Sequence, residues 1–192
     1  MTSYCDYCNS HPEDTFNRTY HDTQYGFPIE DDNELFERLV LEINQAGLSW
    51  ILILKRAQNF RKAFYKFNVK KVANYTEVDR ERLLNDEGII RNKLKVNAAI
   101  VNARKIIELQ KEYGTFKGWL DSHHPLTKEE WTNLFKKTFV FTGGEIVNEF
   151  LMSTGYLPGA HQTDCPIYKK VAAQKPAWMR QSSIKHRKSQ IT

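Results

Sequence analysis

The sequence predicts an all-α protein, and three observations support this fold class. Apolar residues recur at helical spacing along most of the 192 residues, and no convincing run of alternating apolar and polar residues competes with them. Residues that favour helix starts and stops flank these stretches, and the connections are short. Hydrophobic residues make up 41% and aromatic residues 12% of the chain, which is enough for a packed core and excludes wholesale disorder.

The first strongly periodic segment begins at Asp32. One face of this expected helix carries Leu35, Phe36, Leu39, Val40, Ile43 and Ala46. The polar run at residues 31–33 favours a helix start, and Gly47 favours its end. Ser49 could then cap a second helix, which we expect from Trp50 to about Phe67.

Further helices follow to the end of the periodic region. Thr76 and Asp79 have the spacing of a capping box, with Asp in place of the usual Glu. Residues 155–159 break the pattern, and the chain from Lys175 lacks apolar periodicity, so we expect one domain over 1–174 and a basic, mobile tail over 175–192. The expected helices span residues 68–75, 76–86, 92–113, 115–122, 127–137 and 144–154.

The net charge of +5 is distributed in blocks of opposite sign. Residues 1–50 carry a net −8, residues 51–75 carry +7 without an acid, and residues 91–118 carry +5. The last eighteen residues, 175–192, carry +5, so the chain before them is neutral overall. Segregation of this kind is what a phosphate-binding face needs, although net charge alone is weak evidence.

The N-terminus and the cysteine count bear on the compartment. The chain has no stretch of eighteen apolar residues, and its polar start, residues 1–4, is not a secretory signal. Three cysteines cannot all pair within one chain, which argues against a disulfide scaffold. We therefore expect a soluble, cytoplasmic protein, nucleoid-associated in a prokaryote, with no membrane contact and no obligate protein partner.

Cysteines and histidines near the two ends of the chain suggest a metal site. The N-terminal segment offers Cys5, Cys8 and His21, and the far end offers His161 and Cys165. Zinc binds thiolate and imidazole in tetrahedral sets, and two ligands from each end would staple the termini together. On spacing alone, these residues could equally be unrelated. Cys5 and Cys8 could also form a redox pair, although no βαβ pattern accompanies them.

A possible phosphate site lies in the segment of residues 83–93. A helix, a glycine-containing turn at Gly88 and a second helix starting near Asn92 would form a hairpin whose amides can bind a phosphate. Lys93 and Lys95 lie beside it. The other interpretation is an ordinary turn followed by a solvated basic helix. Contacts of this kind position nucleic acid without reading its sequence.

Glu42 is a candidate pocket residue. It lies about 20° outside the apolar arc of the helix from Asp32, taking about 100° per residue. Trp50 follows eight residues later, and Tyr20, Tyr25 and Phe16 come from the N-terminal segment. A carboxylate with aromatic walls suits a flat, electron-poor or cationic heterocycle. The alternative is a surface glutamate beside core aromatics.

Together these motifs resemble those of the DNA-3-methyladenine glycosylase I family, within the helix-hairpin-helix DNA glycosylases. The resemblance covers roughly residues 4–166, and its most specific part is the run Gln-Ala-Gly-Leu-Ser-Trp at residues 45–50. The other matching motifs are Tyr20-His21-Asp22, Tyr25-Gly26-Phe27-Pro28, Leu41-Glu42-Ile43-Asn44, Gly88-Ile89-Ile90-Arg91-Asn92, Asn102-Ala103-Arg104 and His161-x-x-x-Cys165.

The resemblance implies a two-lobed all-α fold with one structural zinc ion. The helix-hairpin-helix lobe would span about residues 17–125, and residues 1–16 and 126–174 would form the zinc lobe. The implied zinc ligands are Cys5, His21, His161 and Cys165. Cys8 has no counterpart in the family pattern and could compete with Cys5.

The family's function can be assigned residue by residue. Glu42 matches the carboxylate that accepts hydrogen bonds from the damaged base, and Tyr20 and Trp50 match aromatics of the base pocket. The turn at Gly47 and Leu48 matches the part that approaches the gap left in the duplex. The remaining DNA contacts would come from the hairpin residues Gly88, Ile90, Asn92, Lys93 and Lys95.

The implied activity is that of a monofunctional glycosylase. It would flip 3-methyladenine out of double-stranded DNA, hold it between Tyr20 and Trp50 with a hydrogen bond to the catalytic Glu42, and remove it by hydrolysis, leaving an abasic site. No lysine stands out as a Schiff-base nucleophile, so we expect no strand cleavage.

Two positions depart from the family pattern. Asn17 replaces a second pocket aromatic, and Tyr25 stands where the family usually has Trp. These departures keep two alternatives open. One is a zinc-stapled helical module that recognises damaged DNA without chemistry, and the other is a glycosylase retuned to another modified base.

Overall fold

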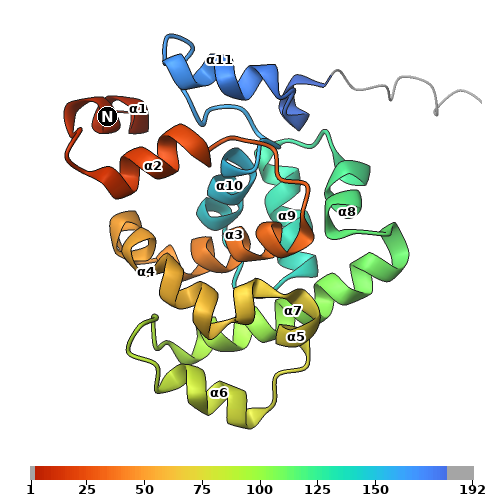
Figure 1. Cartoon of the computed structure of the whole chain (residues 1–192). Coiled ribbons are helices and arrows are strands. Elements are labelled where there is room, and N and C mark those ends of the chain that lie inside the picture. The colour runs from red at the N-terminus through yellow and green to blue at the C-terminus, as the bar shows by residue number, and fades with distance from the viewer. Residues whose placement is uncertain (1–2, 181–192) are drawn as a thin grey trace, which may run out of the picture.

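The computed structural model describes residues 3–180, and every regular element among them is helical (Figure 1). The elements, in order, are α1 (Tyr4–Ser10), α2 (Thr15–Thr23), α3 (Asp32–Gln45), α4 (Trp50–Ala63), η1 (Tyr65–Phe67), α5 (Val69–Ala73), α6 (Glu77–Leu84), α7 (Lys93–Tyr113), α8 (Phe116–His123), α9 (Lys128–Thr138), α10 (Gly144–Ser153), α11 (Pro166–Ala173) and η2 (Ala177–Met179). The predicted fold class, all-α, is confirmed.

Side-chain caps fix the helix starts that the sequence indicated. The Asp31 carboxylate accepts hydrogen bonds from the N–H groups of Asn33 and Glu34 at 2.9 and 3.0 Å, which starts α3. The predicted capping box of α6 is present, with the Thr76 N–H donating to Asp79 at 3.0 Å. Ser49 stands at the N-cap of α4, but its hydroxyl makes no capping hydrogen bond.

The helix from Trp50 ends at Ala63, four residues earlier than predicted. Residues 65–67 follow it with φ between 48° and 56°, in the left-handed region and without a glycine. The burial of Phe64 and Phe67 accounts for this conformation, because their rings stack at 5.4 Å in the core and are at most 1% exposed. No local sequence signal marks this turn.

The hydrophobic core consists of a main cluster and a small satellite. The main cluster runs from Ile29 to Ala177 and joins α3 to α10, with aromatic residues of α8, α9 and α10 packed at its centre. The satellite contains only Cys5, Cys165, Ile167 and Val171, with Phe27 and Tyr168 packed against it. It lies where the two ends of the chain meet, with α1, α2 and α11 on the same side of the molecule (Figure 1).

The terminal segments are more regular than predicted. α1, α2 and α11 are helices in stretches for which no helix was predicted. Residues 175–180 do not form the start of a tail, since Ala177 is buried and the Trp178 N–H donates to the Gly155 carbonyl at 3.2 Å. The rest of the predicted tail, residues 181–192, lies outside the described residues. Within residues 3–180, no helix has both the length and the apolar character that a membrane span requires.

Candidate functional site

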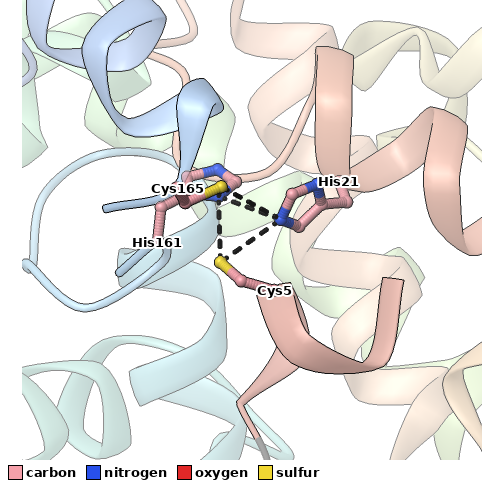
Figure 2. Close-up of side chains that lie close together, drawn as sticks. All are labelled: Cys5, His21, His161 and Cys165. Carbon is pink, nitrogen blue, oxygen red and sulfur yellow. Dashed lines mark hydrogen bonds between the residues drawn. The ribbon is translucent and has the colours of Figure 1, made fainter. Parts of the chain in front are cut away.

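Four side chains from the two ends of the chain converge on one point. Cys5 lies on α1, His21 on α2, His161 in the loop after α10, and Cys165 at the N-cap of α11. Their potential ligand atoms all lie within 4.8 Å of one another, and all four residues are buried (Figure 2). These residues, called the Cys/His cluster below, could hold a metal ion.

Hydrogen bonds outside the Cys/His cluster orient both imidazoles. His21 directs Nε2 at the cluster, and its Nδ1 lies 2.7 Å from a carboxylate oxygen of Asp22. His161 directs Nδ1 inward, and its Nε2 lies 2.8 Å from the backbone oxygen of Tyr25. Metal-binding histidines show this arrangement, in which the second nitrogen donates to a carboxylate or a carbonyl. Burial lowers the pKa of His161, which favours the neutral imidazole that metals bind.

Cys8 is buried but is not part of the Cys/His cluster. Its side chain is 1% exposed on α1, and the four grouped ligands do not include it. The competition with Cys5 that its spacing suggested therefore has no counterpart in the structure. Neither Cys5, Cys8 nor Cys165 forms a disulfide.

A cavity of about 280 Å³ opens beside the Cys/His cluster. It is called the pocket below, and it lies at the small end of the range for ligand sites, as suits a single heterocycle. Its lining residues come from α1, α2, the loop after α2, α3, α4 and α10. They are Tyr4, Tyr20, Tyr25, Glu42, Gln45, Trp50 and Glu149. The structure thus brings the three residues that the sequence assigned to a base pocket into one cavity.

Glu42 is the most deeply buried acid of the pocket. Its side chain is 4% exposed, and burial raises the pKa of its carboxyl from 4.5 to about 8. The positive charge of Arg38 lowers this pKa, and the negative charge of Glu149 raises it further. Arg38 forms no ion pair with Glu42 in the described structure, because its guanidinium donates to the Tyr20 hydroxyl and to the Ser153 carbonyl, both at 3.1 Å.

Tyr20 and Trp50 contact each other directly. Their ring centroids are 5.0 Å apart at an angle of 62°, an edge-to-face contact that leaves no slot for a third ring between them. The expectation that a base lies between Tyr20 and Trp50 is therefore wrong for this arrangement. The two rings form one continuous wall of the pocket instead.

Tyr4 and Tyr25 form a second aromatic wall, and their rings meet edge-to-face at 5.3 Å. The Tyr4 hydroxyl donates to the side-chain oxygen of Asn17 at 2.8 Å. Asn17, where the family pattern has an aromatic residue, thus holds an aromatic side chain supplied by α1. Phe16 does not line the pocket; it is 47% exposed and lines a neighbouring cavity of about 310 Å³.

Tyr4 and Glu149 are pocket residues that sequence reasoning missed. Tyr4 directly precedes Cys5, and its place in the pocket depends on the way the Cys/His cluster folds α1 back onto α2. Glu149 lies on α10, 99 residues after Trp50, the last of the pocket residues marked by motifs in the sequence. Neither carries a local pattern that could have indicated it.

The turn between α3 and α4 projects beside the pocket. Gly47 has a φ of 78°, and a Cβ built on it would meet no atom within 4 Å, so the turn is open on that side. Leu48 packs partly against the main core. The side chain of Gln45 donates to the Leu48 carbonyl at 3.0 Å and ties the turn to α3.

Lys95 does not have the exposed position that the sequence suggested. Its side chain is 5% exposed, and its ammonium donates to the carbonyls of Asn44 and Ala46 at 2.9 and 2.7 Å. Burial lowers its pKa. Because its ammonium binds the last carbonyls of α3, Lys95 is not available to a phosphate, and the prediction of a DNA contact there is wrong. Lys93 is exposed at the first position of α7.

The hairpin between α6 and α7, residues 85–92, is anchored through its carbonyls. Side chains of α4 donate to them: Arg56 to Glu87 and Ile89 at 2.7 and 3.4 Å, and Asn59 to Gly88 at 3.3 Å. Within residues 3–180, no hydrogen bond uses the N–H groups of Ile90, Arg91 and Lys93.

Three other amides, one in the hairpin and two just after it, are already engaged inside the protein. The Gly88 N–H donates to the Asp86 carboxylate at 2.8 Å. The Asn92 side chain caps α7 and accepts from the N–H groups of Leu94 and Lys95. The hairpin therefore offers fewer free amides than its sequence suggests, and among the described residues those of Glu87, Ile90, Arg91 and Lys93 remain.

The chain is similar in sequence to known proteins. The model of the methyladenine glycosylase family matches residues 10–134. The chain belongs to this family. It is 34% identical to the DNA-3-methyladenine glycosylase of Haemophilus influenzae, over 86% of this chain and 98% of that protein. It is also 34% identical to DNA-3-methyladenine glycosylase 1 of Escherichia coli, over 84% and 96%. The resemblance read from the sequence is confirmed.

Solved structures of the family have the same fold. The 3-methyladenine DNA glycosylase I of Staphylococcus aureus superposes with a TM-score of 0.72 at 30% identity, over 79% of this chain and 90% of that one. A variant 3-methyladenine DNA glycosylase I, solved in complex with 3-methyladenine, superposes with a TM-score of 0.73 at 30% identity, over 83% and 96%.

Proposed function

We propose that the chain is a base-excision repair glycosylase that removes 3-methyladenine from alkylated double-stranded DNA by hydrolysis and leaves an abasic site. The observation that carries this proposal is the pocket of a methyladenine glycosylase family member, in which Glu42 is buried among Tyr20, Trp50 and two further tyrosines. The substrate is DNA, so we place the activity in the compartment that holds the chromosome, the cytoplasm or nucleoid of a prokaryote.

The chemistry of the lesion explains why this pocket needs few reactive groups. Methylation at N3 puts positive charge on the adenine ring and weakens the bond from N9 to the sugar C1′. When that bond breaks, its electron pair neutralises the departing base, and the sugar carries the positive charge. Water then attacks C1′ and loses a proton to solvent. The protein has to extrude the base and hold it in place.

The pocket residues supply recognition. The electron-rich faces of the aromatic walls attract a positively charged ring. Glu42 accepts hydrogen bonds from the edge of the base, and the cation favours its ionised form. The Nε1–H of Trp50 is buried with no partner among the described residues, and a bound base offers the acceptor that it lacks.

The absence of a lysine among the pocket's described lining residues favours hydrolysis over strand cleavage. A Schiff-base mechanism needs an amine at the sugar. Lys95, which is 5% exposed, instead uses its ammonium to hold the carbonyls of Asn44 and of the C-cap residue Ala46 at the end of α3. We therefore propose a monofunctional enzyme with no lyase activity.

We propose that DNA contacts come from the turn and the hairpin. Gly47 and Leu48 face the gap that the flipped base leaves. The free N–H groups of Ile90 and Lys93, at the N-terminal end of α7, bind one backbone phosphate, and the Lys93 ammonium adds its charge. Gly88 and Asn92 shape the hairpin through their hydrogen bonds within the protein.

We also propose that the Cys/His cluster binds one structural zinc ion. Tetrahedral zinc with ordinary bond lengths sets its ligand atoms about 3.4 Å apart for two nitrogens and about 3.6 Å for nitrogen and sulfur. The two imidazole nitrogens of the cluster are 3.2 Å apart, and nitrogen–sulfur distances range from 3.3 to 3.9 Å. Zinc bound here would join α1 and α2 to the segment that precedes α11.

One assay tests the activity. The protein is incubated with methylated double-stranded DNA, and free bases are separated by chromatography. We expect release of 3-methyladenine by the wild type, little release by Glu42→Gln, and no nicked strand without added base or lyase. Wild-type release equal to that of Glu42→Gln would contradict the enzymatic proposal and leave a DNA-binding module.

Metal analysis tests the zinc proposal. We expect about one zinc per wild-type chain and much less in His161→Ala. The control is Cys8→Ser, which changes a buried cysteine outside the Cys/His cluster and should retain the metal. Equal zinc in wild type and His161→Ala would remove His161 from the site.

A further inference from the structure

Glu149 is a second carboxyl group in the pocket, and the proposed reaction leaves it without a role. It lies on α10, is half-buried, and lines the cavity that Glu42 also lines. Its carboxylate accepts a hydrogen bond from the Tyr25 hydroxyl at 3.2 Å, and the amide of Asn148 lies 3.5 Å away. No ion pair within residues 3–180 involves Glu42 or Glu149.

Two carboxyl groups without a paired cation are costly in a small cavity. Taking a carboxylate out of water is unfavourable unless a partner compensates it, and a second negative charge nearby adds repulsion. Burial raises the pKa of both groups, and Glu149 contributes to the rise at Glu42. Among the described residues, Arg38 is the cation that acts on Glu42, and its hydrogen bonds go elsewhere. The pocket thus holds two carboxyl groups and, within residues 3–180, no cation paired with either of them.

The simplest explanation for a carboxyl group at position 149 is that it positions Tyr25. Its bond to the Tyr25 hydroxyl could serve only to orient that ring. A neutral glutamine could accept the same hydrogen bond without the cost of a partly buried charge, because its side-chain amide has an oxygen of its own. The charge of Glu149 therefore calls for a different explanation.

We propose that Glu149 is a specificity-determining residue, which makes the pocket prefer an N-alkylated purine that carries positive charge over a neutral modified purine. This inference rests on the proposed function, since it concerns the base that the same pocket receives. A cationic ring between two carboxyl groups and aromatic faces gains attraction from each of them. A neutral ring would also displace water from both carboxyl groups, but it would provide no charge–charge attraction to offset that cost.

The reaction determines which kinetic constant Glu149 should affect. The positive charge lies on the base before the bond breaks and moves to the sugar as it breaks, so carboxyl groups beside the base favour the bound substrate. They do not favour the step that removes its charge. Glu149 should therefore strengthen binding of the lesion and weaken its hold on the neutral product. Its loss should raise KM and should not lower kcat.

The first experiment measures binding with small probes and needs no catalysis. The cationic probe is the 3,9-dimethyladeninium ion, and the neutral probe is 9-methyladenine. Calorimetry gives the affinity of each for wild type, Glu149→Gln and the control Glu145→Gln. Glu145 lies on the same helix, and its side chain is 88% exposed.

We expect wild type and Glu145→Gln to prefer the cation. Glu149→Gln should bind the cation roughly tenfold more weakly and the neutral probe equally well. No preference in the wild type, or an unchanged preference in Glu149→Gln, would overturn the inference. Preference for the cation without any excision from DNA would contradict the proposed function and leave the inference standing.

The second experiment separates charge from positioning. Single-turnover excision is measured over a range of methylated DNA concentrations for Glu149→Gln and for Tyr25→Phe, which removes the hydroxyl and keeps the carboxylate. We expect the half-saturating concentration to rise about tenfold in Glu149→Gln, with a maximal rate that is not lowered. If Tyr25→Phe reproduced this rise and the loss of cation preference, Glu149 would act only by holding Tyr25, and the inference would be wrong.

Discussion

The main core and the terminal satellite are built on different principles. The main core packs large apolar side chains from α3 to α10, with many of them fully buried. The satellite has four small or medium apolar residues, and two of them, Cys5 and Cys165, belong to the Cys/His cluster. Where little apolar surface is available to hold two chain ends together, the proposed zinc ion would supply the missing link.

The pocket lies between these two regions and takes residues from both. Tyr4 and Tyr20 come from α1 and α2, next to the Cys/His cluster, while Glu42, Trp50 and Glu149 come from helices of the main core. We therefore predict that the satellite and the main core can lose their structure separately. Loss of the metal should open one wall of the pocket, and changes in the core should alter the stability of the whole domain.

Removal of the metal should have the largest effect. Chelation of the metal should release α1 and part of α2, because little apolar packing holds them, while α3 to α10 stay folded. We expect hydrogen exchange of α1 amides to accelerate by at least a hundredfold, exchange in α7 to change little, and excision to fall with the loss of Tyr4 from the pocket.

Added zinc should restore both exchange protection and activity. His161→Ala should behave like the chelated protein, and Cys8→Ser should not. If α1 exchanged equally slowly with and without metal, the satellite would be held by packing alone, and the contrast between the two regions would disappear.

Replacement of Glu42 should have the next largest effect, and it should raise the stability of the folded protein instead of lowering it. Its pKa is about 8 in the folded protein, against 4.5 as its ordinary value. The folded state therefore keeps its proton where the unfolded state has lost it, and stability falls as the pH rises from about 4.5 to 8. Each pKa unit corresponds to about 1.4 kcal/mol, so this cost is on the order of a few kcal/mol above pH 8.

We expect Glu42→Gln to be more stable than wild type by about 2–4 kcal/mol at pH 8.5 and nearly equal to it at pH 4.5. Urea unfolding at both pH values, with the exposed Glu145→Gln as control, measures the difference. The same variant should have lost excision. A Glu42→Gln protein less stable than wild type at pH 8.5 would show that the carboxylate is compensated in the folded state.

The sequence predicted the helices of the main core far better than those of the satellite. The starts of α3 and α6 depend on local capping residues such as Asp31 and Thr76, which a sequence displays directly. α1, α2 and α11 are short, and contacts between residues far apart in the sequence position them, so no periodic pattern marks them. The left-handed turn at residues 65–67 follows from tertiary burial of Phe67.

In the candidate site, too, some residues could be predicted from the sequence and others could not. The resemblance identified Glu42, Tyr20 and Trp50, which line one cavity in the structure. Tyr4 and Glu149 could not be predicted, since their places depend on how α1 and α10 pack against those motifs. Their assignment to the pocket needed three-dimensional contacts.

Lys93 and Lys95 lie on the same helix, but their positions around the helix axis give them different environments. They are two residues apart, so they lie about 200° apart around α7. Lys93 faces solvent, and Lys95 faces the end of α3. From the sequence, both lysines were predicted to contact phosphate, and the structure separates them.

Lys95→Met should destabilise the main core by about 1–3 kcal/mol, because it leaves the carbonyls of Asn44 and Ala46 without their buried donor. It should also lower excision, since these carbonyls end α3 just before the Gly47 turn. Urea unfolding and single-turnover kinetics measure both effects. Lys93→Met is the matched control and should change stability by less than about 0.5 kcal/mol. Equal stabilities of the two variants would contradict the structural role of Lys95.

Lys93→Met should have the smallest effect, confined to DNA binding. An exposed lysine beside free amides at the start of α7 adds one phosphate contact, and each such contact contributes about 0.9 to the slope of log K against log salt concentration. We expect the slope measured on undamaged duplex DNA to decrease by about this amount in Lys93→Met and to remain unchanged in Lys136→Met, an exposed change on α9. The affinity should fall by a similar factor on every DNA sequence, because a phosphate contact reads no base. An unchanged slope in Lys93→Met would place the phosphate contact elsewhere, with the exposed lysines of α4 and α5 as the next positions to test.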